Sequence, residues 1–259
     1  MINRDLVILL RNLANKYETE DFLKEDPSRF MHEVEGQKNQ ETIAFIASCL
    51  SYGSRKQFFP KIRYIIKCSK GDVYNWVLNN KFEKDIPDND ECYYRLYSNH
   101  MMNKFLHALS DMLAIYGSLG NYLKRNCLSA RNFNSDEKAT ALECVEALSE
   151  FFTQKGVEVI VPKNTKSSCK RVCMFLRWMV RDKSPVDLGL WADFIDKKSL
   201  IMPLDTHVMQ ESRNLELTCS KTASMSTAIE LSETMLEVFP DDPLRGDFAL
   251  FGLGVNKGK

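Results

Sequence analysis

Apolar residues recur every three to four positions along most of this chain, which places them on one side of an α-helix. The segments with this spacing are 2–17, 40–51, 58–68, 72–79, 101–115, 137–154, 169–181, 222–239 and 247–253. Alternating β-branched residues, which are typical of strands, form one short run at Val157–Val161. The sequence therefore predicts an all-α fold.

The length of the chain, 259 residues, lies near the upper limit of what one hydrophobic core can organise. No internal repeat or low-complexity linker divides it, so we expect a single domain, 1–259, or two closely packed helical lobes. Breaks between helices are expected where proline, asparagine and aspartate cluster. These positions are 26–27, 86–90, 132–136, 162–168 and 241–243.

No segment approaches the roughly 18 consecutive apolar residues of a membrane span, so we expect no membrane association. Arg4 and Asp5 precede a short apolar run with no small-residue cleavage site, which is typical of an amphipathic helix and not of a signal peptide. The eight cysteines are scattered and none forms a CxxC pair, which favours reduced thiols and disfavours zinc and iron–sulfur sites. We expect a cytoplasmic monomer without a metal.

Basic and acidic residues balance at 35 each, but the basic ones are unevenly distributed. Ser54–Lys70 contains six basic residues and no acidic residue, and Lys155–Lys183 contains eight basic residues against two acidic ones. Two local patches on a neutral protein suit contact with a phosphate backbone along one face. The alternative interpretation is that both are ordinary solvated helix faces.

Segment 169–181 combines an apolar stripe with a mostly cationic one. The stripe expected to be buried consists of Val172, Phe175, Leu176 and Met179. The opposite stripe consists of Lys170, Met174, Arg177 and Arg181. Ser167 or Ser168 is expected to cap this helix, whose start would offer backbone N–H groups to a phosphate. An amphipathic surface helix with a good cap is the alternative.

The segment Leu200–Val208 reads Leu-Ile-Met-Pro-Leu-Asp-Thr-His-Val. Taken alone, Asp205 predicts the N-cap of a helix. The proline two residues ahead of it and the Thr-His-Val after it resemble a motif of the helix-hairpin-helix DNA glycosylases. In that motif the catalytic aspartate stands at a helix start.

The resemblance extends to both sides of this motif. Lys170-Arg171-Val172, after a hairpin-like turn, is similar to the site of the nucleophile in lysine-dependent 8-oxoguanine glycosylases. The long spacer between lysine and aspartate is most similar to that of the archaeal-type GO glycosylases. Other segments resemble the closing helices or the early apolar helix of the superfamily: 228–231, 239–243, 247–254 and 45–53.

Three motifs, one of them the Asp205 segment, are similar to an uncharacterised bacterial family. They are Leu-Arg-Trp-Met-Val-Arg, Asp-Leu-Gly-Leu-Trp and Pro-Leu-Asp-Thr-His-Val. The resemblance is strong from about Pro162 to Val255 and weaker before it. Two departures are the absence of a Gly-x-Gly in the hairpin turn and the presence of Gly53-Ser54-Arg55 where a glutamine often probes the flipped-base gap.

The resemblance implies a two-lobed helical fold, with a helix-hairpin-helix at about 155–181 and a catalytic-aspartate segment at about 200–215. It implies that Lys170 is the nucleophile and Asp205 the electrostatic stabiliser, with no cofactor. The partner would be double-stranded DNA carrying a damaged base, flipped out of a kinked duplex. The residues expected to contact DNA are Arg55, Lys56, Lys163, Lys166, Ser167, Ser168, Arg171, Arg177 and His207.

The activity implied is excision of an oxidised purine, 8-oxoguanine foremost, followed by strand cleavage through a lysine Schiff base. Two alternatives remain open: an alkylated-base glycosylase that uses Asp205 alone, and a non-catalytic helix-hairpin-helix module that binds DNA or RNA. Lys170 separates the first two functions, and base release separates both from the third. Trp178 and Trp191 are expected in the core and not in the site.

Overall fold

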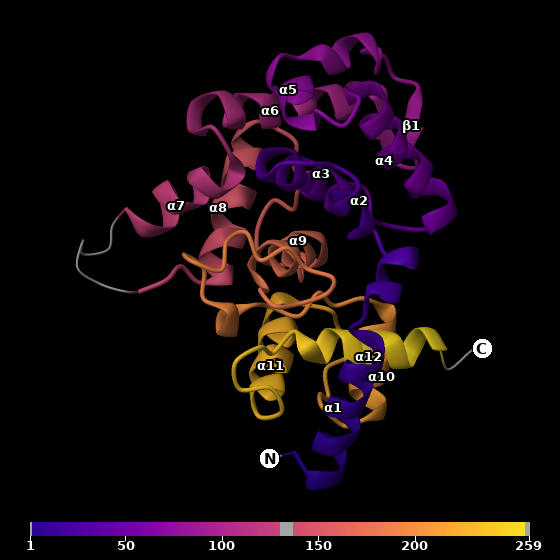
Figure 1. Cartoon of the computed structure of the whole chain (residues 1–259), viewed down its shortest axis with the longest axis vertical. Coiled ribbons are helices and arrows are strands. Elements are labelled where there is room, and N and C mark those ends of the chain that lie inside the picture. Colours follow the sequence, from indigo (N-terminus) through magenta and orange to yellow (C-terminus); the bar gives the residue numbers. More distant parts are fainter. Residues whose placement is uncertain (1, 130–136, 257–259) are drawn as a thin grey trace. The chain divides into compact units, whose positions relative to one another are not determined.

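Helices dominate the computed structural model, which describes residues 2–129 and 137–256 (Figure 1). This confirms the predicted all-α class. Among the described helices, none combines the length and apolar character needed to cross a bilayer.

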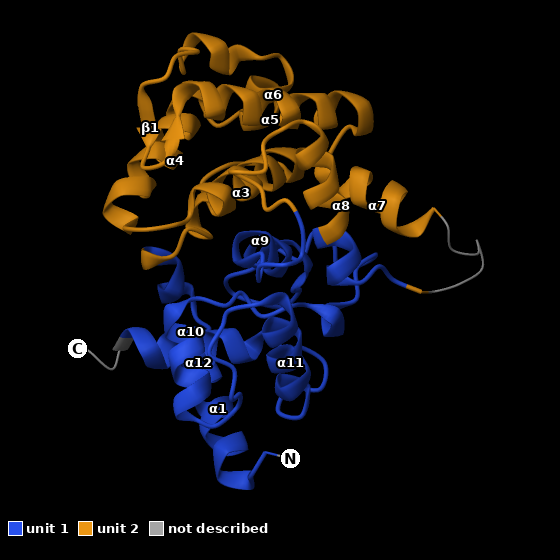
Figure 2. Ribbon diagram, turned by 180° about the vertical axis from the view of Figure 1, so that it is seen from behind, with its two compact units in different colours: residues 1–24, 138–145, 164–259 blue, residues 25–137, 146–163 orange. Residues whose placement is uncertain are grey.

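The chain divides into two compact units, each assembled from segments that are distant in sequence (Figure 2). Unit 1 comprises residues 1–24, 138–145 and 164–259, and unit 2 comprises residues 25–137 and 146–163. The division falls inside helix α8 (Ala141–Gln154). The N-terminal helix therefore belongs with the C-terminal part of the chain.

Unit 1 contains α12 (Arg245–Asn256), which packs against both α1 (Arg4–Tyr17) and α10 (Thr206–Asn214) (Figure 1). The approach of α1 requires Gly252, because a Cβ there would lie 2.2 Å from Cδ2 of Tyr17. The remaining elements of this unit are η1 (Glu20–Glu25) as far as Lys24, the start of α8, α9 (Lys170–Val180), η3 (Lys197–Ser199) and α11 (Met225–Leu236).

Unit 2 is organised around α3 (Gln37–Leu50), in which every residue from Glu41 to Leu50 is buried. Helix α3 packs against α2 (Arg29–His32), α4 (Arg55–Ser69) and α5 (Val73–Leu78). The other elements are η2 (Lys81–Lys84), β1 (Cys92–Tyr94), β2 (Tyr97–Ser98), α6 (Asn99–Tyr116), α7 (Leu119–Leu128) and the rest of α8. Strands β1 and β2 form an antiparallel hairpin.

All nine predicted helices are present, with ends shifted by up to four residues. Helix α7 was not predicted; it begins after Gly117, whose φ of 77° ends α6, and Ser118 caps it. The apolar run Val157–Val161 forms a turn and not a strand, because the Val161 N–H donates to the Val157 carbonyl at 3.1 Å.

The predicted breaks at 26–27, 86–90, 162–168 and 241–243 lie between helices, whereas 132–136 lies outside the described residues. Of the predicted helix-hairpin-helix region, 155–181, the only helical part is α9. The preceding helix, α8, ends at Gln154, so a helix–loop–helix arrangement extends from residue 141 to residue 180.

Candidate amine–carboxylate site

Helix α9 is buried on nearly all sides in unit 1. The apolar stripe is buried as predicted. The opposite stripe is also buried from Met174 onward, since Met174, Arg177 and Arg181 are only 8%, 3% and 1% exposed, so the alternative of an amphipathic surface helix is wrong. Burial of a guanidinium is unfavourable unless anionic partners surround it, and acidic residues from distant parts of the chain fulfil that role here.

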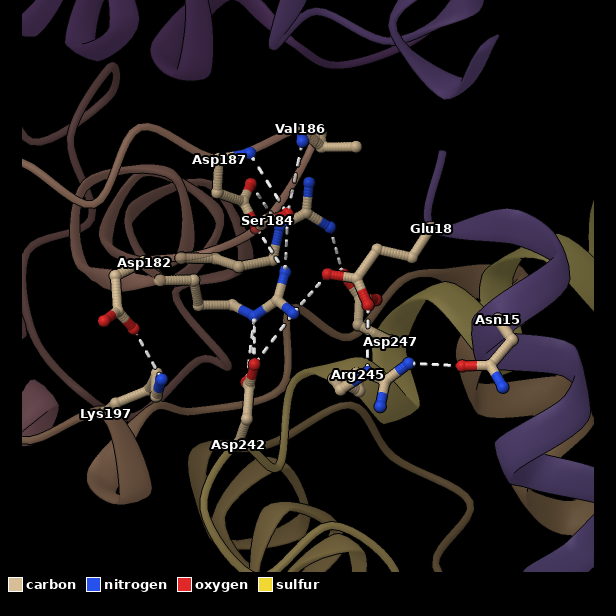
Figure 3. Close-up of polar contacts among 12 residues, drawn as sticks. Asn15, Glu18, Asp182, Ser184, Val186, Asp187, Lys197, Asp242, Arg245 and Asp247 are labelled. Carbon is tan, nitrogen blue, oxygen red and sulfur yellow. Dashed lines mark hydrogen bonds and ion pairs between the residues drawn. The ribbon is translucent and has the colours of Figure 1, made fainter. Parts of the chain in front are cut away.

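The Arg181 guanidinium pairs with three carboxylates, those of Glu18, Asp187 and Asp242, which are labelled in Figure 3. Its Nη1 donates to Asp187, its Nη2 lies 2.6 Å from Oε1 of Glu18, and its Nε lies 2.9 Å from Oδ1 of Asp242. Burial alone would raise the pKa of Glu18, but the charges and hydrogen bonds of Arg181 and Arg245 outweigh it and lower that pKa. Arg181 therefore ties α9 to the end of α1 and to the turn before α12.

Arg177 lies in the same buried network and cannot contact DNA as expected. Its Nη1 donates to Oδ2 of Asp247 at 2.5 Å, and its Nε lies 3.4 Å from Oδ1 of Asp187. Only 4% of the Arg177 side chain is exposed. The expectation that it contacts phosphate was wrong, because periodicity does not reveal the carboxylates that pair with it.

The loop after α9 explains the Asp-Leu-Gly-Leu-Trp motif in structural terms. Asp187 pairs with the two buried arginines. Gly189 has a φ of 64°, and a Cβ there would lie 2.8 Å from the backbone Cα of Asp182, so glycine is required. Trp191 packs edge-to-face on Phe175 with ring centroids 5.2 Å apart, and it is buried, as is Trp178. The expectation that both tryptophans belong to the core is confirmed.

Helix α9 begins at Lys170, directly after Cys169, which has a left-handed φ of 45°. Cys169 occupies the N-cap without a side-chain hydrogen bond, so the predicted cap by Ser167 or Ser168 is wrong. The Ser167 hydroxyl instead accepts from the Cys169 N–H at 3.5 Å, and Ser168 is buried. Lys170 thus stands at the first helical position, with 36% of its side chain exposed.

Helix α10 begins with the N-cap that the sequence predicts. Oδ1 of Asp205 accepts a hydrogen bond from the Val208 N–H at 2.8 Å. This bond satisfies one of the free donors of the first turn and orients the carboxylate. Only 15% of the Asp205 side chain is exposed.

The structure brings Lys170 and Asp205 together across 35 positions of sequence, with Nζ of the lysine 3.5 Å from Oδ2 of the aspartate. The pair opens onto a pocket of about 420 Å³. Its lining residues are Lys170, Leu204, Asp205, Thr206, Met209, Arg213, Lys221 and Ala223. A primary amine and a carboxylate that face one pocket can attack and stabilise an electrophilic carbon.

The other predicted contact residues of unit 1 lie near the helix starts. Lys166 and Ser167 are exposed in the loop before α9, and Arg171 is half-buried in its first turn. His207 is exposed on α10, with its ring edge-on to Phe251 at 6.1 Å between centroids. These four residues are accessible or partly accessible, and their contact with phosphate stays a prediction.

The remaining predicted contact residues belong to unit 2. Lys163 is exposed in the loop after α8. Arg55 and Lys56 are the first residues of α4, where Lys56 is exposed and Nη1 of Arg55 lies 3.7 Å from Oε2 of Glu25. Contact of these three residues with DNA also stays a prediction.

Sequence reasoning missed two cationic residues of the pocket, Arg213 and Lys221. A signal for Arg213 was present, since Asp205, Met209 and Arg213 are spaced by four residues and share one helix face. Lys221 lies in the loop before α11, where no periodicity could have indicated it.

No group of three His, Cys, Asp or Glu side chains suited to a metal ion occurs within residues 2–129 and 137–256. Burial raises the pKa of the Cys169 and Cys173 thiols, which favours the protonated form over the thiolate that metals prefer. The polar side chains that line this pocket are those of Lys170, Asp205, Thr206, Arg213 and Lys221.

The fold and this pocket define a helical protein with an amine–carboxylate pair at two helix starts. The chain belongs to a family described as "Protein of unknown function (DUF2400)", which matches residues 26–256. No curated protein and no solved structure matches the chain. Both Lys170 and Asp205 lie inside the matched range.

Proposed function

We propose that this chain is a DNA glycosylase with AP lyase activity, of the helix-hairpin-helix type, that excises an oxidised purine, 8-oxoguanine foremost, from double-stranded DNA. The observation that carries the proposal is the 3.5 Å approach of Lys170 Nζ to Asp205 Oδ2. The amine stands on the first residue of α9 and the carboxylate at the N-cap of α10. This is the placement that the resemblance implies for nucleophile and stabiliser.

The pocket suits a nucleotide that has been rotated out of the duplex. A base inside the stack cannot be reached, so an enzyme of this kind must first extrude it. The volume of about 420 Å³ lies within the usual range for small-molecule sites. Leu204, Met209 and Ala223 provide apolar surface beside the charged pair.

In the first step Nζ of Lys170 gives up one proton and attacks C1′ of the sugar. The C1′–N bond breaks, and the base leaves with the bonding electron pair and takes up a proton. Positive charge develops at the sugar, and Oδ2 of Asp205 stabilises it while Oδ1 remains bound to the Val208 N–H. The carboxylate is thus held in place before the reaction begins.

In the second step the sugar ring opens and leaves a protonated imine between Lys170 and C1′. Loss of a proton from C2′ and cleavage of the C3′–O bond, with the phosphate as leaving group, then break the strand. Water hydrolyses the imine and restores the free amine. No step needs an oxidant, a reductant or a metal.

Borohydride trapping tests the proposal, because borohydride reduces an imine to a stable protein–DNA adduct. Protein incubated with an 8-oxoguanine duplex and borohydride should give a cross-linked species whose modified peptide contains Lys170. An undamaged duplex of the same sequence serves as the control. An adduct at another lysine overturns the assignment of the nucleophile.

Two other outcomes favour the alternatives. Base release without any adduct, with alkylated duplexes as further substrates, indicates a glycosylase that uses Asp205 alone. Binding of duplex DNA without release of any base indicates a non-catalytic module.

A further inference from the structure

The pocket of Lys170 and Asp205 contains more positive than negative charge. Two cationic side chains, Arg213 and Lys221, line it together with the Lys170 amine and a single carboxylate, that of Asp205. That carboxylate is already occupied by the Lys170 amine and the Val208 N–H. Arg213 and Lys221 are exposed, and neither forms an ion pair within the described part of the chain.

Arg213 lies on α10 at some distance from the Lys170–Asp205 pair, so its charge is not part of that pair. Asp205, Met209 and Arg213 follow one another on one helix face. At 1.5 Å per residue, Arg213 lies about 12 Å along the axis from Asp205. A group bound by Arg213 is therefore a neighbour of the group held at Lys170, with Met209 between them.

We propose that Arg213 and Lys221 bind a backbone phosphate of the damaged strand next to the nucleotide held at Lys170 and Asp205. The inference rests on the proposed function. A phosphodiester supplies the negative charge that the pocket lacks, and a guanidinium can donate two hydrogen bonds to its oxygens. The competing explanation is structural: Arg213 lies in the last turn of α10, where a cation stabilises the helix end.

Salt dependence of DNA binding tests the phosphate contact without relying on chemistry. The ligand is a duplex with a tetrahydrofuran abasic analogue, which cannot form an imine, titrated by fluorescence anisotropy between about 50 and 200 mM salt. Arg213→Gln and Lys221→Gln should each weaken binding and reduce the slope of log K against log salt by about one.

Arg4→Gln and Lys16→Gln are the charge-matched controls, because both residues are exposed on α1 and neither lines the pocket. They should leave the slope unchanged. Equal slopes for the parent protein and both pocket variants, or a loss of thermal stability without a change of slope, would overturn the inference in favour of the structural explanation.

Methylphosphonate substitution identifies the phosphate itself. Replacing one backbone phosphate at a time with its uncharged analogue should weaken binding by the parent protein at one position beside the lesion. The same substitution should have little further effect on the double variant Arg213→Gln/Lys221→Gln, since both contacts to that phosphate are already lost. Equal losses for both proteins at every position overturn the inference. Competition by millimolar inorganic phosphate that is as strong as competition by DNA also overturns the inference, because the site then binds free phosphate and not a backbone phosphate.

The outcomes separate this inference from the proposed function. Changed slopes without a borohydride adduct retain the phosphate site and refute the glycosylase–lyase activity. An adduct at Lys170 with unchanged slopes retains the activity and refutes the phosphate site. Absence of any duplex binding refutes both.

Discussion

Nζ of Lys170 lies 3.5 Å from Oδ2 of Asp205, while the other oxygen of the same carboxylate holds the first turn of α10 through the Val208 N–H. The two oxygens of Asp205 thus have different roles, one structural and one facing the amine. Substitutions can separate these roles, because an amide keeps an oxygen acceptor but has no negative charge.

Asp205→Asn should retain the fold and lose the base excision that we propose. The amide oxygen can still cap α10, so the melting temperature should stay near that of the parent protein. Base excision should fall by orders of magnitude, since an amide cannot stabilise a cationic sugar. Thermal denaturation and single-turnover excision measure the two effects. Asp205→Ala is the matched variant, and loss of the cap should lower its stability by about 1 kcal/mol.

If Asp205→Asn excises the base at the parental rate, Asp205 is a structural cap and not a catalytic residue. A large loss of stability in the asparagine variant would instead show that the charge itself maintains the fold.

Lys170→Gln should lose adduct formation and strand cleavage. Its side chain is 36% exposed and opposes the buried stripe, so the free energy of unfolding should change by no more than about 0.5 kcal/mol. Lys16→Gln removes another exposed lysine, on α1 and outside the pocket lining, and is the control. Denaturant unfolding and borohydride trapping provide the measurements, and undiminished cleavage by Lys170→Gln contradicts the assigned role.

Arg181→Met should strongly destabilise the protein. The substitution leaves Glu18, Asp187 and Asp242 without the buried cation that they share. Removing one partner from a buried ion network usually costs about 3–5 kcal/mol. Arg245→Gln is the control, because Arg245 also pairs with Glu18 but 35% of its side chain is exposed, and it should cost about 1 kcal/mol or less. Similar losses in both variants would show that Arg181 is not the centre of the network.

Glu18 should contribute to the acid limb of the stability curve. Its pKa is lower in the folded protein than its ordinary value of 4.5, despite burial, because Arg181 and Arg245 stabilise the charged form. The stabilisation is therefore complete above pH 4.5 and is lost as the pH falls through the lower, folded-state pKa. Glu18→Gln should flatten this part of the curve in denaturant unfolding at a series of pH values. An unchanged acid limb contradicts the prediction.

Gly189→Ala should destabilise the loop that follows α9. The new methyl group meets a backbone atom, the Cα of Asp182 at 2.8 Å, in addition to the strain of a φ of 64°. Gly71→Ala is the control for strain alone, because its φ is 84° and nothing lies within 4 Å of its Cβ position. The control should lose about 1 kcal/mol and Gly189→Ala clearly more. Equal losses in thermal denaturation would mean that the loop moves away at little cost.

Helix positions were the most predictable part of the structure, because the spacing of apolar residues is a local property. The cap by Asp205 was also predictable, since the signal lies within four residues. The burial of Arg177 was not, because its partner Asp247 is 70 residues away and no local pattern links them. The approach of Lys170 to Asp205 is likewise a tertiary contact, and only the resemblance to a known family indicated it.

The acidic partners of α9 determine when this helix can be buried during synthesis of the chain. Arg177 and Arg181 are synthesised well before Asp242 and Asp247, so the nascent helix cannot be buried with its full set of counter-charges until those aspartates have left the ribosome. Lys170, on the first turn of that helix, reaches its final position only when α9 is in place. A ribosome-bound chain arrested before residue 242 should therefore remain sensitive to protease around α9.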